Sequence, residues 1–97
     1  MLFVSSIKFT PQGITNIRDT CKRADSLKAA AKKMGVKVSD ILWTLGPFDG
    51  LIVFEAPDEE TATALMLHLG SLGNIQTQTT RAYRAAEMKS ILEAMPK

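Results

Sequence analysis

Cysteine, histidine and tryptophan each occur only once among the 97 residues of the chain. Because Cys21 has no partner in the chain, the sequence excludes an internal disulfide, a thiolate metal cluster and a Cys-x-x-Cys redox pair. His68 also stands alone, since the residues at helical spacing around it carry no metal-ligating group. We therefore expect neither a metal site nor a bound cofactor.

The chain also lacks a long apolar run. Apolar residues make up 45% of the composition, which suffices for a packed core, but no stretch approaches the length that spans a bilayer. The opening run from Met1 to Val4 is interrupted by Ser5 and Ser6, too early to form the apolar region of a signal peptide. The sequence thus predicts a cytoplasmic protein with no membrane association.

Neither sign of charge is in large excess. The 12 basic and 10 acidic side chains leave a net charge of +2, which is too small to indicate a polyanionic partner. Basic side chains gather along the first predicted helix, but no aromatic side chains alternate with them. We interpret them as a solvated face and expect no nucleic-acid partner. These residues are Arg18, Lys22, Arg23, Lys28, Lys32 and Lys33.

Strand-like apolar patterns recur four times along the chain. They predict strands over residues 2–9, 36–45, 51–54 and 75–83. Asp40 interrupts the second of these runs in the manner of a bulge or a strand edge. Pro47 favours the first corner of a turn from Gly46 to Asp49, which joins the second and third strands in a hairpin.

Three further segments have helical spacing. In the first, Thr10 caps a helix that begins at Pro11, and a single apolar stripe predicts one continuous helix over residues 11–34. The stripe consists of Ile14, Ile17, Cys21, Ala24, Leu27, Ala31 and Met34, so we expect the Cys21 thiol to be buried and inert. Asp58 caps the second helix, which ends at Gly70 to Gly73, and a third occupies residues 85–95.

The element order βαββαβ with an additional C-terminal helix predicts a ferredoxin-like α+β fold. Its four-stranded antiparallel sheet and helices would form one domain over residues 1–97. Right-handed crossovers place both main helices on one face and leave the other uncovered. Residues 51–54 are apolar at both alternating positions, so the uncovered face is apolar as well. Because it would expose roughly 300 to 400 Å², we expect a second copy to cover it.

Short motifs follow one another along nearly the whole chain. They are Thr10-Pro11-Gln12-Gly13-Ile14, Leu45-Gly46-Pro47-Phe48-Asp49, Glu55-Ala56-Pro57-Asp58, Leu69-Gly70-Ser71-Leu72-Gly73-Asn74, and Thr77, Thr79 and Arg81-Ala82. In this order and spacing they resemble the GYD-domain family, small proteins of largely uncharacterised function. The resemblance implies a dimeric α+β barrel, in which two sheets pack face to face, and it implies no agreed activity. Phe48 stands where the family has its tyrosine, and Gly50 where a larger apolar residue is commoner.

Four side chains are candidates for a ligand site near the predicted turn. Trp43, Thr44 and Asp49 lie at the strand ends beside it, and Arg81 can project from the edge strand. Such a pocket would suit a small anion or a polar aromatic molecule. Two of them also have a structural interpretation: for Asp49 we favour hydrogen bonding to the backbone of the turn, and Trp43 suits a core or a dimer interface.

No constellation for catalysis is visible. The carboxylates Glu55, Asp58, Glu59 and Glu60 are mostly explained by their place at a helix start. We therefore expect a homodimeric small-molecule-binding or assembly module without catalysis. The Gly-x-aromatic-Asp pattern also resembles the effector domains of feast/famine regulators, which bind amino acids between subunits.

The alternative is a cofactor-independent monooxygenase of the dimeric α+β-barrel kind. Such an enzyme needs a pocket between sheet and helices. A cavity lined by Trp43, His68, Tyr83 or Asp49 would favour it, and a sealed core would exclude it.

Overall fold

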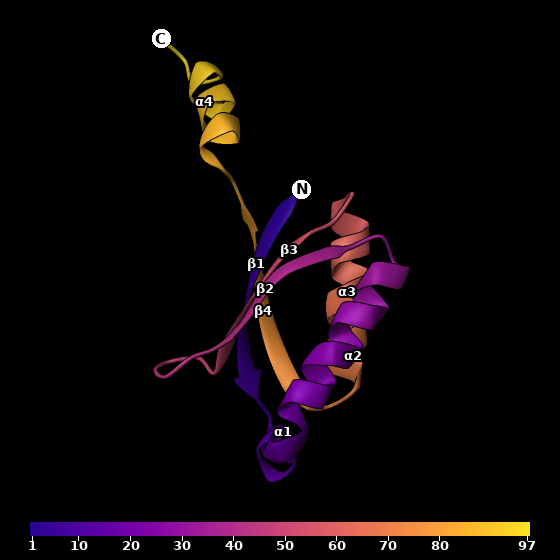
Figure 1. The fold of residues 1–97 in the computed structure, drawn as a ribbon. Helices are drawn as coiled ribbons and strands as arrows, with labels where there is room; N and C mark the ends of the chain where they lie inside the picture. The colour runs from indigo at the N-terminus through magenta and orange to yellow at the C-terminus, as the bar shows by residue number, and fades with distance from the viewer.

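The computed structural model describes all residues 1–97, and its elements follow the order that the sequence predicts, with one helix divided (Figure 1). They are β1 (Leu2–Phe9), α1 (Pro11–Thr15), the 3-10 turn η1 (Ile17–Asp19), α2 (Thr20–Lys33), β2 (Lys37–Trp43), β3 (Gly50–Glu55), α3 (Glu59–Ser71), β4 (Ile75–Ala82) and α4 (Ala85–Glu93). None of the helices has the length and apolar character needed to cross a membrane.

The four strands form one antiparallel sheet in the order β2-β3-β1-β4. Strand β1 therefore lies inside the sheet, with Ile7 opposite Gly50 of β3 and Phe9 opposite Ile75 of β4. The pairing of β2 with β3 shifts between Val38 and Asp40, which confirms the predicted irregularity. The ferredoxin-like α+β fold is thus confirmed.

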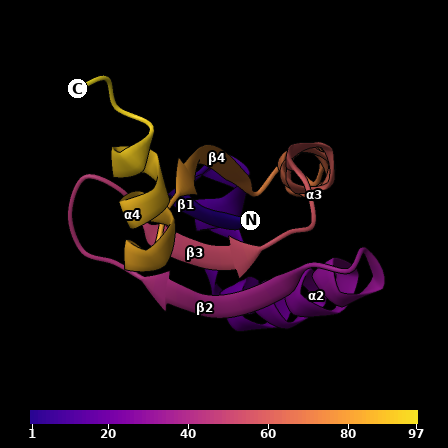
Figure 2. The same ribbon diagram turned by 90° about the horizontal axis from the view of Figure 1, so that it is seen from above.

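Helices α2 and α3 cover the same face of the sheet (Figures 1 and 2). Buried side chains from the strands meet buried side chains from these helices in one core. The rings of Phe3 and Phe54 stack at its centre, with centroids 5.3 Å apart. Ser5 is the one polar residue that is fully enclosed, and its hydroxyl is satisfied by a 2.9 Å hydrogen bond with the Thr79 hydroxyl.

The prediction of one continuous first helix was wrong. The chain forms α1, the η1 turn and then α2, because α1 is fastened to the loop before β4. Thr10 donates from its hydroxyl to the Gly73 carbonyl (2.6 Å), and a Cβ at Gly13 would lie 2.0 Å from the carbonyl oxygen of Asn74. Only a glycine at this position allows so close an approach. This docking fixes α1 beside the end of the sheet, whereas α2 lies across it.

The division of the helix also changes which side chains are buried. Ile14 and Ile17, which the continuous stripe placed in the core, are 56% and 36% exposed. Cys21 is exposed as well, so the prediction that it packs as a buried hydrophobic residue was wrong. The buried face of α2 is instead formed by Leu27 and Ala31.

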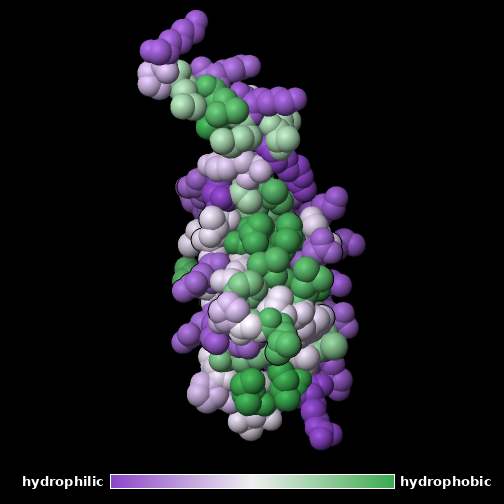
Figure 3. Space-filling model, turned by 90° about the vertical axis from the view of Figure 1, so that its left-hand side faces the viewer, coloured by the Kyte–Doolittle hydropathy of each residue, from purple (hydrophilic) through white to green (hydrophobic).

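The second face of the sheet is not covered by any helix. Along β3, Leu51 and Val53 point to this side and are half-buried, while the residues between them are buried under the helices. Leu42 lies opposite Leu51, and Val4 lies opposite Val53, so these side chains adjoin one another. Figure 3 looks onto this side and shows a hydrophobic stripe along the molecule with polar groups on both flanks.

Helix α4 lies beyond the end of the sheet, displaced to the uncovered side (Figures 1 and 2). None of its residues is buried. Its apolar side chains recur at helical spacing and are 38 to 52% exposed; they are Met88, Ile91 and Leu92. The helix ends at Glu93, so Met95, which the sequence placed in it, lies past its end. The rest of the chain therefore leaves the apolar stripe of α4 only partly covered.

Candidate functional site

A cavity of about 310 Å³ lies between the sheet and the two covering helices, at the end where β1 stops and the β2–β3 hairpin turns. Twelve of its 19 lining residues are hydrophobic. Ile7 and Ile52 contribute from the sheet, Leu27 from α2 and Leu69 from α3. Sheet and helices therefore diverge at this end instead of closing the core.

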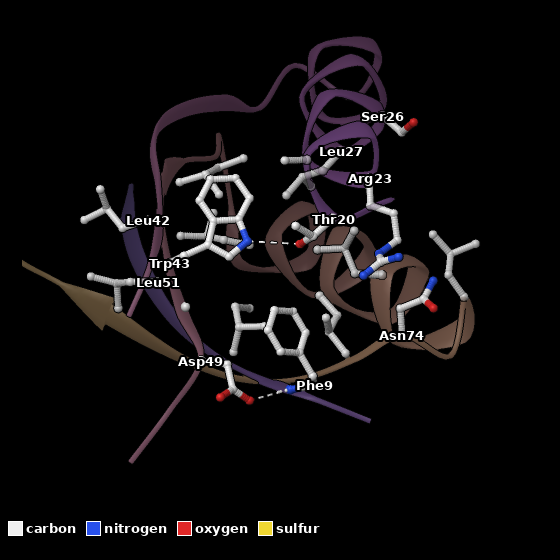
Figure 4. A pocket seen from close by; sticks show the side chains of 18 of the residues that line it. Phe9, Thr20, Arg23, Ser26, Leu27, Leu42, Trp43, Asp49, Leu51 and Asn74 are labelled. Carbon is white, nitrogen blue, oxygen red and sulfur yellow. Dashed lines mark hydrogen bonds between the residues drawn. The ribbon is translucent and has the colours of Figure 1, made fainter. Parts of the chain in front are cut away.

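Trp43 borders the cavity where β2 ends. It lies opposite Gly50 in the sheet, and its indole N–H donates a 3.0 Å hydrogen bond to the Thr20 hydroxyl at the start of α2. Figure 4 shows this bond between the strand and the helix. The Trp43 side chain is 48% exposed, so one part of the indole contacts the cavity and another part contacts solvent.

Asp49 holds the backbone around the hairpin turn. Its carboxylate oxygen Oδ2 accepts the N–H of Phe9 (2.9 Å), and its own N–H donates to the Ile7 carbonyl (2.7 Å). Thr44 adds two bonds: its N–H donates to the Asp49 carbonyl (3.0 Å) and its hydroxyl to that of Phe48 (2.7 Å). Asp49 is among the lining residues, but its carboxylate turns toward Phe9 (Figure 4). These contacts favour the structural interpretation of Asp49, and Thr44, which does not line the cavity, likewise holds the turn.

Arg81 lies at the other end of the sheet and does not line this cavity. It is paired with Phe3, which is four residues, or roughly 13 Å, along β1 from Ile7. Its guanidinium donates to the Glu87 carboxylate (2.8 Å) and lies 4.7 Å from the centroid of the Tyr83 ring. The hydrogen bond from Arg81 holds the pKa of Glu87 below its ordinary value. Arg81 therefore connects α4 to the sheet.

Arg23 lines the cavity although the sequence placed it on a solvated face. Its guanidinium donates to the backbone carbonyls of Asn16 (2.7 Å) and Gly13 (3.4 Å). Arg23 has no carboxylate partner. The ion pairs in the chain join Arg81 to Glu87 and Arg84 to Glu55. Arg23 precedes Leu27 by four residues, and this spacing was the available signal that both share one side of α2.

Asn74, just before β4, His68, on α3, and Ser26, on α2, also belong to the polar part of the lining. Figure 4 shows Asn74 and Arg23 on the same side of the cavity. The His68 side chain is exposed, so it borders the mouth of the cavity rather than its interior. The cavity thus combines apolar walls with a few polar groups at its edge.

Together, the fold and the cavity define a small ferredoxin-like α+β protein with an open pocket between sheet and helices. A family model for the GYD domain matches residues 3–92, and the chain belongs to this family. The resemblance that the sequence motifs carry is thereby confirmed.

Relatives and structural neighbours come from different functional classes. A protein of Thermus thermophilus, described as a glutamine synthetase and cystathionine beta-lyase binding protein, is 39% identical over 57 residues. The match covers 59% of this chain and 60% of that relative, so it spans less than two thirds of the relative's length.

Two solved structures share the fold. One is 5-chloro-2-hydroxyhydroquinone dehydrochlorinase from Burkholderia phenoliruptrix in complex with 2,5-dihydroxybenzoquinone, with a TM-score of 0.65 and 16% identity over 90% of this chain and 98% of that one. The other is an ACT domain protein from Streptococcus pneumoniae, with a TM-score of 0.50 and 17% identity over 98% and 96%. At these identities the similarity concerns the fold alone.

Proposed function

We propose that the protein is a homodimeric module that binds a small molecule in the cavity between sheet and helices, without catalysis of its own. The cavity is the observation that carries this proposal. Its volume of about 310 Å³ and its mostly apolar lining are typical of the smaller ligand sites in proteins. The polar groups at its edge would orient the ligand.

The state of the polar side chains supports binding rather than catalysis. Asp49 already accepts a backbone N–H, so its carboxylate is poorly placed to take a proton from a bound molecule. Cys21, the only thiol, does not line the cavity. Its exposure suits a reducing compartment, and we propose a cytoplasmic location on this ground.

The uncovered sheet face and α4 support self-association. Four strands about 4.8 Å apart and roughly 18 Å long give a face of about 350 Å² per copy, or about 700 Å² for two. A stable interface buries at least about 1,200 Å² in total, so the sheet alone is too small. The apolar stripe of α4 supplies additional area on the same side of the molecule (Figure 2). We therefore propose that a second copy contacts both surfaces.

The Thermus relative extends the proposal to the binding of other proteins. Its description as a protein that binds two enzymes supports a role for this chain in binding other proteins. A ligand in the cavity would then regulate such an assembly. If the cavity binds nothing, the assembly role remains as the proposed function.

Thermal-shift screening against amino acids and small organic anions tests ligand binding. The matched control is Ala24→Leu, which places additional carbon atoms in the cavity from α2. We expect at least one class of compound to raise the melting temperature of the wild-type protein and not that of the variant. Equal stabilisation of both proteins, or of neither by any compound, would contradict the small-molecule proposal.

A second candidate function is a cofactor-independent monooxygenase acting on an activated aromatic molecule. The observation that favours it is the cavity itself, since Trp43, Asp49 and His68 all line it. His68 is the side chain best suited to remove a proton there. Oxygen consumption in the presence of hydroquinones, lost in His68→Gln, would support this function. An unchanged rate in the variant would exclude His68 as the base.

A further inference from the structure

We infer that the ligand of the cavity is a small, flat, singly charged anion, such as an aromatic carboxylate, and that Arg23 binds its charged group. This inference rests on the proposed function, because it requires that the cavity is a binding site. It adds the chemical class of the ligand and the residue that selects it.

The charge balance of the lining is the first support. Arg23 is half-buried at the cavity and has no carboxylate partner. The carboxylate of Asp49, which also lines the cavity, accepts the N–H of Phe9 and forms no ion pair with Arg23. A half-buried cation without a carboxylate partner favours an anionic ligand, and a carboxylate matches the forked donors of a guanidinium.

The position of Arg23 is fixed before any ligand arrives. Two of its N–H groups are held by carbonyls at the end of α1, at 2.7 and 3.4 Å. A guanidinium has five N–H donors, so others remain for a ligand. Figure 4 shows the group reaching from α2 toward the other lining side chains. Because Arg23 is already ordered, binding costs little side-chain entropy.

The walls favour a flat, apolar body for the ligand. Trp43 borders the cavity from β2 and Phe9 borders it from β1 (Figure 4). Aromatic and aliphatic walls of this kind bind rings well. Gly50 lies opposite Trp43 on the sheet and also lines the cavity; a Cβ there would lie 2.9 Å from the carbonyl oxygen of Leu42, so this position has no room for a side chain.

The same lining disfavours a zwitterion. An amino acid would bring an ammonium group that needs a free carboxylate, and Asp49 is the one acidic residue of the lining. That carboxylate turns toward the backbone of β1 (Figure 4), so an ammonium group placed beside Arg23 would lie next to a cation with no carboxylate directed at it. We therefore expect amino acids to bind less well than simple carboxylates.

Benzoate and benzamide provide the test, since they share size and shape and differ in charge. We measure their affinity, and that of phenylalanine, by calorimetry with the wild-type protein, Arg23→Met and Lys22→Met. Lys22 is the matched control, because it is exposed on the same helix and does not line the cavity. We expect benzoate to bind roughly tenfold more tightly than benzamide or phenylalanine, and only Arg23→Met to abolish the difference.

Salt dependence keeps the test decisive even if Arg23→Met unfolds. Benzoate binding to the wild-type protein should weaken as salt is added, whereas benzamide binding should not change. Equal affinity for both compounds, preferred binding of phenylalanine, or no benzoate binding would overturn the assigned ligand class. The proposed site itself fails in a different way, namely if benzoate still binds to Ala24→Leu with wild-type affinity.

Discussion

Replacing Val4 by lysine should dissociate the proposed homodimer without unfolding the chain. Val4 lies on β1 in the interior of the uncovered face, between Val53 on one neighbouring strand and Thr80 on the other. In a monomer the half-buried site lets the lysine ammonium reach water. In a face-to-face dimer both ammonium groups are removed from water, and the carboxylates on this face offer no close partner: Asp40 lies two strands away on β2, and Glu55 is already paired with Arg84.

The cost of that enclosure sets the size of the effect. An uncompensated charge in an apolar interface costs about 3 kcal/mol, so two copies of Val4→Lys would lose about 6 kcal/mol per dimer. This loss raises the dissociation constant by about four orders of magnitude. Sedimentation velocity at micromolar concentration should show a dimer for the wild-type protein and a monomer for the variant, with equal far-UV circular dichroism.

Ala64→Lys serves as the control for the added charge. Ala64 is exposed on α3, away from the uncovered face, so this variant should remain dimeric. A wild-type protein that sediments as a folded monomer would refute the reasoning. A Val4→Lys variant that is still dimeric would show instead that the copies associate through another surface.

Three further predictions concern contacts that hold the fold together. Gly13→Ala should lower the free energy of unfolding by more than about 2 kcal/mol in urea titrations, because the new methyl group collides with backbone; Gly70→Ala, in open space, should not. Asp49→Ala should cost about 2 kcal/mol and Asp49→Asn less than about 1, since asparagine still offers an acceptor to β1. Because Arg81 lowers the pKa of Glu87, the stabilisation by this pair is fully present at neutral pH and is lost as the pH falls through that lowered pKa. NMR relaxation should then show α4 loosening in acid, and Glu87→Gln should show the same loosening at neutral pH.

Local signals in the sequence were sufficient for most of the fold. Alternation placed β1 at its observed bounds, and the both-sided apolar character of residues 51–54 identified β3 as an inner strand. The Asp58 cap is equally local: its carboxylate accepts the Thr61 N–H at 2.7 Å, and hydrogen bonding by the Thr61 side chain together with this backbone bond lowers the pKa of Asp58. Each of these features depends on neighbours within a few residues.

The division of the first helix depends instead on a tertiary contact. Periodicity treated residues 11–34 as one stripe, but the close approach of Gly13 to Asn74 joins segments 61 residues apart. Because the stripe was extended through this point, Cys21 was placed in the core and Arg23 in solvent. When helical spacing is counted from Thr20, where α2 begins, Arg23 and Leu27 fall on the side of the helix that lines the cavity.

The misplacement of Arg81 has a topological cause. Strand β4 runs antiparallel to β1, so its first residue, Ile75, lies at the end where β1 stops. The cavity end of the sheet therefore receives Asn74 and Ile75, and Arg81 falls at the opposite end. The topology predicted from the sequence already implied this direction, whereas the existence of the cavity depends on how far the helices diverge from the sheet.

The indole N–H signal of Trp43 gives the most direct test of the proposed binding site. It is the only tryptophan of the chain, and its N–H bonds to Thr20 at the cavity. During an NMR titration with a stabilising compound, we expect this single resonance to shift and saturate at one ligand per chain. Binding that leaves it unchanged, while signals of Val4 and Val53 on the uncovered face move, would contradict a ligand site between sheet and helices.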